Sequence, residues 1–128
     1  MSRDLVVLGR VEPGDAAFGA ALEAAGEGLL ASGAGGVLRL WDEADGRLVF
    51  SVEPPVLVET EGEPARVLGP EVAHVTPPVW WVEVRAVEDV DGAEVRATRF
   101  AAELSLQVDG CLWCDDPGYA ERAGLRGR

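Results

Sequence analysis

The sequence predicts an α+β fold of the ferredoxin-like split βαβ type, with an antiparallel sheet, two helices on one face and an inserted segment at about residues 54–78. Residues 77–88 alternate between apolar and mixed positions, which is the two-residue period of a strand. Two other segments carry apolar residues at helical spacing. A strand, helix, glycine and short apolar strand follow one another twice, as expected for two tandem βαβ units. This plan places both helices on the same face of the sheet.

The first predicted unit begins with a strand at residues 4–12. Its apolar run at residues 5–8 indicates burial on both faces. Asp15 is a residue type that caps helices, and apolar positions recur at helical spacing after it. Because glycine is unfavourable inside a helix, we expect this helix to end near Gly26 or to continue frayed to Ala31.

A β-hairpin is predicted next, after a flexible connection at residues 32–36. Its strands are residues 37–41 and 47–53, and Gly46 suits the positive φ of the turn. Residues 56–60 are expected to form a short edge strand. The remainder of the insertion carries turn signals, so we interpret it as a long excursion that returns the chain to the sheet.

The second unit begins with the strand at residues 77–88, which we expect to lie in the middle of the sheet. A helical apolar stripe then runs from Ala93 to Val108, and Gly110 is placed where a left-handed residue ends a helix. A last strand is predicted at residues 111–115. We expect one domain over residues 1–116 and a flexible tail over residues 117–128.

The alternation of the central strand assigns its side chains to two faces. Trp80, with the small apolar residues that follow at every second position, is expected to face the helices. Trp81, Glu83 and Arg85 point the other way, to a face that we expect to be open to water or to a partner.

The composition is strongly acidic, with 23 Asp and Glu, 11 Arg, no Lys and a net charge of -12. Such a field repels nucleic acid and anionic membranes, which need basic surfaces, and attracts a basic protein. No apolar run approaches the roughly 18 residues of a membrane span, and the first residues do not resemble a signal peptide. We therefore expect a cytoplasmic protein, although an acidic surface also serves solubility alone.

The sequence carries no catalytic, cofactor or metal signature. Cys111 and Cys114 form a C-x-x-C, but in a strand this spacing sends the two side chains to opposite faces, so we expect free thiols. His74 is the single histidine, and no nucleophile or orienting partner is identifiable near it. We expect no catalytic residues, no cofactor and no metal.

Acidic clusters and aromatic residues are the features that suggest binding. Asp42, Glu43 and Asp45 lie in the predicted hairpin, where acidic residues are also common simply because a loop is solvated. Trp is common among binding hot spots, so Trp41 and Trp81 are the expected anchors. The predicted partner-binding residues are Trp41, Asp42, Glu43, Asp45, Trp81, Glu83 and Arg85.

In size, charge and α/β plan the chain resembles the small acidic immunity proteins that bacteria make against toxins. The resemblance also rests on F-A-x-x-L at residues 100–104, followed by G-x-x-W at residues 110–113. It implies a non-enzymatic protein that binds a basic toxin or enzyme and occludes its active site.

Two other interpretations remain open. One is a ferredoxin-like enzyme or small-ligand-binding protein whose site lies near His74. The other is a self-associating structural subunit, a homodimer in which two open sheet faces pack together through Trp81.

Overall fold

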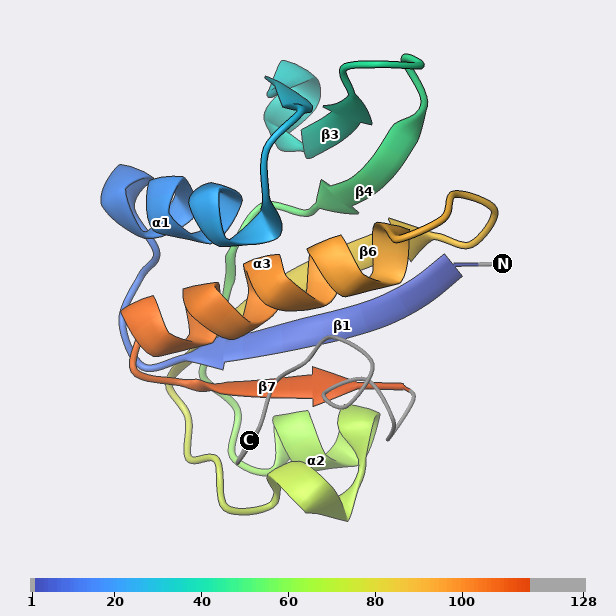
Figure 1. Ribbon diagram of the computed structural model, residues 1–128. Helices are drawn as coiled ribbons and strands as arrows, with labels where there is room; N and C mark the ends of the chain where they lie inside the picture. The colour runs from blue at the N-terminus through green and yellow to red at the C-terminus, as the bar shows by residue number, and fades with distance from the viewer. Residues whose placement is uncertain (1, 116–128) are drawn as a thin grey trace.

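The computed structural model describes residues 2–115, so the predicted tail at residues 117–128 lies outside the described part. The described chain forms an open seven-stranded antiparallel sheet between two layers of helix, with α1 and α3 on one face and α2 on the other (Figure 1). The α+β class and the antiparallel sheet are confirmed.

The strand order is β2-β3-β4-β6-β1-β7, and β5 pairs with β6 outside this path. The strands are β1 (Ser2–Gly9), β2 (Leu29–Ser32), β3 (Leu38–Asp42), β4 (Leu48–Val52), β5 (Val56–Val58), β6 (Val79–Val87) and β7 (Cys111–Cys114). The helices are α1 (Asp15–Ala25), α2 (Glu63–Leu68) and α3 (Ala93–Gln107), with short 3-10 turns η1 (Ala34–Gly36) and η2 (Pro70–Val72).

Strand β6 is central, as predicted, because it pairs with β1 on one side and with β4 and β5 on the other. Strand β1 is buried on both faces. Leu5 and Val7 belong to the main core beneath α1 and α3, whereas Val6 and Leu8 belong to a second apolar cluster beneath α2 and η2. The two faces of the sheet therefore both support packed layers.

Helix α3 has the predicted apolar stripe, and Phe100 and Leu104 are fully buried in the main core. The helix ends differently from the prediction, because the positive φ falls on Asp109 at 50°. Gly110 is required for a different reason. A Cβ on it would lie 2.0 Å from the carbonyl oxygen of Leu8, so the turn passes too close to β1 for any side chain.

The region after α1 also differs from the prediction. Gly14 is the N-cap residue, without a side-chain cap, and Asp15 is the first residue of the helix. The helix ends at Ala25, and Gly26 adopts φ 105°. The extension to Ala31 is wrong, because Leu29–Ser32 is the edge strand β2, paired with β3.

The inserted segment covers part of the sheet face that lies opposite α1 and α3. Residues 54–78 contain β5 as predicted, but also α2 and η2, which the sequence pattern did not indicate. Apolar side chains of α2 and η2 pack on Val6, Leu8 and Val79. The face expected to be open is therefore partly covered by the chain's own insertion.

Candidate functional site: a groove beside helix α2

An apolar groove lies between helix α2 and strands β5 and β6, and it has a volume of about 440 Å³. A narrower continuation of about 180 Å³ extends along β6 towards β1 and β7. Both parts are lined by Glu53, Val67, Trp81 and Glu83, so they form one continuous depression. We call it the α2 groove. Its other lining residues are Asp4, Leu5, Val6, Pro54, Val56, Val58, Glu63, Leu68, Val84, Arg85, Trp113 and Asp115.

The walls of the groove follow from local sequence. Pairing of Val56 with Trp81 places β5 along β6 as one wall. Helix α2 forms the other, with Pro64 in its first turn and Gly69 just after its last residue, the usual positions of proline and glycine at helix ends. Leu68 packs on the second cluster, while the side chain of Val67 is left 52% exposed. The groove thus combines a packed floor with an exposed apolar wall.

Trp81 and Glu83 are adjacent on the floor. The indole N–H of Trp81 donates a hydrogen bond to Glu83 Oε1 at 3.1 Å, and the ring packs against the second cluster. Trp81 is half-buried, so it is held in one orientation while part of the ring faces the groove. This differs from the freely exposed anchor expected from the sequence.

Carboxylates outnumber cationic groups among the residues that line the apolar groove. Its lining includes the carboxylates of Asp4, Glu53, Glu63, Glu83 and Asp115 and one guanidinium, that of Arg85. Arg85 Nε lies 3.0 Å from Asp4 Oδ1, and this hydrogen bond to a carboxylate raises the pKa of Arg85. Arg85 is therefore engaged within the chain.

Arg66 on α2 forms a two-pronged pair with Glu63, with distances of 2.5 and 3.0 Å. These hydrogen bonds hold the pKa of Glu63 below its ordinary value. Glu63 consequently remains ionised at neutral pH and contributes a fixed negative charge at the mouth of the groove, partly compensated by Arg66.

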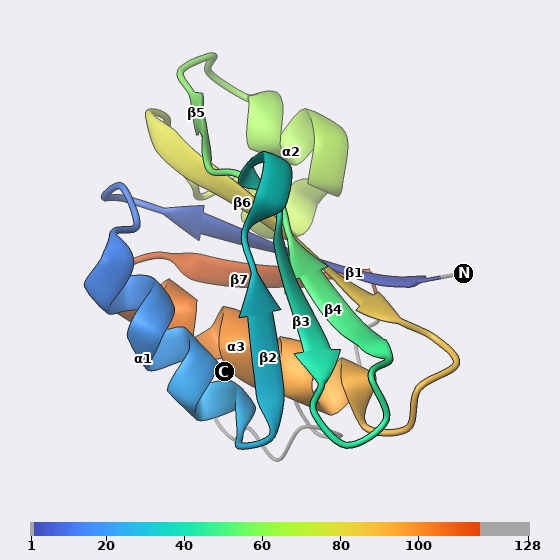
Figure 2. The same cartoon turned by 90° about the horizontal axis from the view of Figure 1, so that it is seen from above.

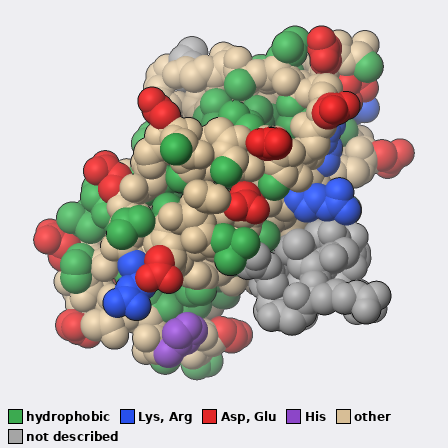
Figure 3. All heavy atoms as spheres, turned by 60° about the vertical axis from the view of Figure 1, so that its left-hand side comes forward, with side chains coloured by type: hydrophobic (Ala, Val, Ile, Leu, Met, Phe, Trp, Pro, Cys, Tyr) green, Lys and Arg blue, Asp and Glu red, His purple; other side chains and the backbone are tan. Residues whose placement is uncertain are grey.

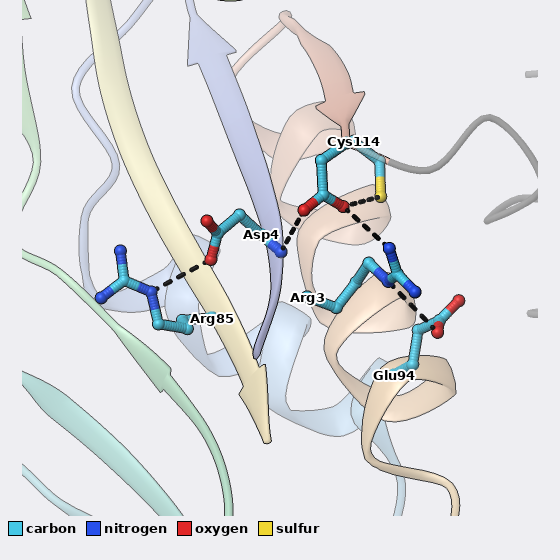
Figure 4. Close-up of polar contacts among 6 residues, drawn as sticks. Arg3, Asp4, Arg85, Glu94 and Cys114 are labelled. Carbon is cyan, nitrogen blue, oxygen red and sulfur yellow. Dashed lines mark hydrogen bonds and ion pairs between the residues drawn. The ribbon is translucent and has the colours of Figure 1, made fainter. Parts of the chain in front are cut away.

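Asp115 fixes the inner end of the groove. One carboxylate oxygen, Oδ1, lies 3.4 Å from Arg3 Nη1, and the other, Oδ2, accepts the backbone N–H of Asp4 at 3.3 Å. The Cys114 thiol also approaches this carboxylate, at 3.7 Å, and Arg3 pairs with Glu94 of α3 at 3.5 Å (Figure 4). The last described residue thus contacts both Arg3 and Asp4 of β1.

The hairpin residues predicted for binding lie elsewhere. Trp41 and Asp42 end β3 at the tip of the β3–β4 hairpin, which lies at the opposite end of the sheet from α2 (Figure 2). Asp42 Oδ1 accepts the N–H groups of Ala44 and Asp45 at 2.7 and 3.4 Å, and Asp45 Oδ1 accepts that of Arg47 at 3.0 Å. Asp42 and Asp45 therefore shape the turn.

The hairpin tip joins a second acidic segment. Arg47 Nη2 lies 3.0 Å from Asp89 Oδ2 and links the tip to the β6–α3 loop, which also carries Glu88 and Asp91. Trp41 is half-buried, and Glu43 is exposed. The structure therefore gathers acids at this end but does not bring them to Trp81, Glu83 and Arg85.

A second cavity, of about 620 Å³, surrounds His74. Arg10, Thr76, Asp109 and Cys111 also line it. The guanidinium of Arg10 lies 3.9 Å from the Asp109 carboxylate, and these side chains are 77% and 82% exposed. His74 is exposed as well. The cavity is open, and its charged side chains and the imidazole are largely exposed.

The two cysteines lie on opposite faces of β7, as predicted. Cys111 packs with the second cluster and Cys114 with the main core, and neither is in a disulfide. Burial raises the pKa of the Cys111 thiol, so it is protonated at neutral pH and is a poor nucleophile. Within residues 2–115 no group of three or more His, Cys, Asp or Glu side chains is arranged to hold a metal ion.

Sequence reasoning missed Glu53, Val56 and Val67, which form much of the groove wall. Val67 is unremarkable in the sequence because a six-residue helix is too short to show a period. The proline near the start and the glycine after the end of α2 were the available signals.

Acidic side chains outnumber basic ones on the face of the molecule drawn in Figure 3, in keeping with the net charge of -12. None of the described helices combines the length and the apolar composition that crossing a bilayer requires. Comparison of the chain with protein-family models, curated proteins and solved structures finds no match.

Proposed function

We propose that this protein is a non-enzymatic binding module for a basic protein, and that the α2 groove is its binding site. The observation that carries the proposal is the combination of an apolar groove around Trp81 with a rim of carboxylates. Apolar contacts supply most of the binding free energy at such a site, while the carboxylates select and steer a cationic partner.

The held orientation of Trp81 supports this role. Its hydrogen bond to Glu83 and its packing against the floor restrict the ring before a partner arrives. An anchor that is already ordered loses little conformational entropy on binding. A basic residue of the partner would be placed near Glu53 and Glu83 while an apolar residue contacts Val67.

The acidic hairpin tip has a separate part in the proposal. Because the tip and α2 lie at opposite ends of the sheet (Figure 2), the same small segment of a partner is not expected to contact both, but the charge of the tip adds to the field that attracts a basic protein. Glu43 is the best residue for testing this, because Asp42 and Asp45 also hold the turn.

The biological role that we propose is that of an immunity or inhibitor protein, which neutralises a basic toxin or enzyme by covering its active site. The scaffold is proposed to be ferredoxin-like, with β4-β6-β1-β7 as its four core strands and β2, β3 and the insertion as additions. Both α1 and α3 lie on one face of these strands, which leaves α2 to shape the groove.

The experiment uses the basic protein encoded beside this one, because an immunity protein is expected next to its toxin. Association is followed by stopped-flow tryptophan fluorescence between 25 and 500 mM NaCl. We expect the rate constant to fall by about tenfold or more with salt, because screening removes electrostatic steering. E43R should slow association, whereas E23R on α1 should change it less.

A matched pair of surface variants locates the site. V67R places a charge in the groove wall, and L106R makes the same change on α3, where Leu106 is 58% exposed. We expect V67R to raise the dissociation constant by about tenfold or more and L106R to leave it unchanged. Equal effects of the two variants, or no complex at all, would reject the groove as the binding site.

A second candidate function, a small-ligand-binding protein or enzyme, is favoured by the cavity around His74. Its 620 Å³ volume lies within the range of ligand sites, and a carboxylate and a guanidinium line it with the imidazole. Titration of the full chain with inorganic phosphate and with acetate, followed by the backbone amide signals of Thr76 and Asp109, tests this function. Saturable shifts that H74A abolishes would support it, and their absence would count against small anions.

A further inference from the structure

We propose that the arginine-rich segment at residues 119–128 docks in the α2 groove of its own chain and competes there with the basic partner. The competition rests on the proposed function, but the docking itself does not. Three observations lead to it: where the chain leaves the described fold, the charge of the segment, and the apolar wall of the groove.

The described chain ends at the groove. Asp115 lines the narrow part of the α2 groove, and its backbone N–H donates to the carbonyl oxygen of Asp4 at 3.2 Å. Its carboxylate holds Arg3 and the backbone of Asp4 (Figure 4). The point at which the chain leaves the described fold therefore lies beside the groove.

The charges are complementary. Residues 116–128 contain three arginines and two acids, a net charge of +1 in a chain of -12, which leaves -13 on residues 1–115. The positive charge is concentrated at residues 122–128, which carry Arg122, Arg126 and Arg128 and no acid. Five carboxylates line the groove; Asp4, Glu63 and Asp115 pair with arginines of the fold, and within residues 2–115 Glu53 and Glu83 are the two for which no such pair is seen. The basic stretch begins seven residues after Asp115, within reach of these two carboxylates.

The segment after Asp115 is long enough to span the α2 groove. Thirteen residues follow Asp115 in this sequence, and an extended chain of that length spans up to about 45 Å. The six residues of α2 rise only about 9 Å. Leu125, between Arg122 and Arg126, is the apolar residue that would contact the exposed side chain of Val67.

Tethering makes the docked state effective even when each contact is weak. A segment attached by a short linker is present at an effective concentration in the millimolar range. If it occupies the groove about 90% of the time, the apparent dissociation constant of a competing partner rises about tenfold. The segment would then act as a built-in competitor that only a strongly basic partner displaces.

The first experiment compares the full chain with its R122A/R126A/R128A variant by ¹⁵N NMR at 25 and 500 mM NaCl. We expect the Trp81 indole N–H signal and the amide signals around Val67 to differ at low salt and to converge at high salt. Signals from the hairpin tip, including Glu43, serve as the internal control and should not move. Unchanged groove signals would overturn the proposal.

A second experiment adds a synthetic peptide of residues 117–128 to both full-length proteins. We expect the peptide to bind the R122A/R126A/R128A variant at least about tenfold more tightly than the wild type, because the wild-type segment already occupies the site. Equal affinities, or no binding to either protein, would contradict docking.

Groove variants of the full chain complete the test. E53R reverses a charge that lines both parts of the groove, and E23R makes the same change on the exposed side of α1. E53R should produce the groove shifts seen on loss of the tail arginines, whereas E23R should not. A response to E23R of the same size would mean that the effect is one of overall charge.

The experiments distinguish failure of the docking proposal from failure of the proposed function. If a basic protein binds the groove while loss of the tail arginines leaves the groove signals unchanged, docking is wrong and the proposed function stands. If the tail moves the groove signals but no basic partner binds, docking stands and the proposed function is wrong.

Discussion

Gly110 lies where the turn after α3 crosses the end of β1. A Cβ at this position would meet the carbonyl oxygen of Leu8 at 2.0 Å and the Cα of Gly9 at 2.8 Å, both of them backbone atoms. Neither can move without disturbing β1, the strand that joins β6 to β7.

We therefore expect G110A to lower the free energy of unfolding by about 3 kcal/mol or more, at the upper end of overpacking effects. G19A is the control. Gly19 lies within α1 with no heavy atom near its would-be Cβ, so alanine should stabilise the protein by about 0.5–1 kcal/mol. Urea unfolding measures both variants, and similar stabilities would contradict the close approach.

Trp81 illustrates how packing revises a prediction from sequence. The alternation of β6 places it opposite Val82 and Val84, and the structure confirms this, but its ring also packs on the second cluster. Trp80, expected to be core, is only half-buried.

We expect W81A to lower the free energy of unfolding by about 1–3 kcal/mol, the loss of roughly half of a tryptophan's burial. V67A, at an exposed position of the same groove, should change it by less than about 0.5 kcal/mol. Thermal melts compare the two variants. If W81A were as stable as the wild type, packing of the Trp81 ring in the groove floor would contribute nothing to the stability of the fold.

Helix α2 is the element on which the groove depends. Its six residues are too few to be stable alone, since isolated helices shorter than about 12–15 residues are marginal in water. Packing of Ala65 and Leu68 on the second cluster holds it in place, and the Glu63–Arg66 pair adds a local contact.

The lowered pKa of Glu63 predicts a pH-dependent contribution. The folded state favours the ionised carboxylate, so this contribution is present above the ordinary value of 4.5 and is lost as pH falls through the lower folded value. We expect E63Q to be slightly less stable than the wild type at pH 7 and equally stable near pH 2. Denaturation at both pH values, with E61Q as the control, tests this; a difference that persists in acid would have another cause.

The whole molecule is asymmetric in how its two sheet faces are covered. Within residues 2–115, α1 and α3 cover one face with a large core, whereas α2 and η2 cover part of the other (Figure 1). Pairing of two copies through this second face would bring two acidic grooves together, at a chain charge of -12 each.

Repulsion of this kind predicts a monomer. We expect light scattering at 10 µM and low salt to give the mass of one chain, because like charges oppose association and Trp81 is already packed within its own fold. A mass of two chains that V67R reduces to one would establish the homodimer instead.

The sequence by itself determined the parts of this protein that rest on long periodic segments. The alternation of β6, the stripe of α3 and the doubly buried run of β1 each follow from one strong local pattern, so the α+β class and the antiparallel sheet were predictable. The separation of Cys111 and Cys114 followed in the same way.

Only the tertiary structure decided the placement of the short elements. Strand β2 has four residues and α2 six, too few for a period, and each exists because a neighbour completes its hydrogen bonds or its packing. The groove arises where α2 meets β5 and β6, between residues such as Val56, Val67 and Glu83 that are distant in sequence. No local pattern encodes such a meeting, because its geometry depends on how the whole insertion folds back over the sheet.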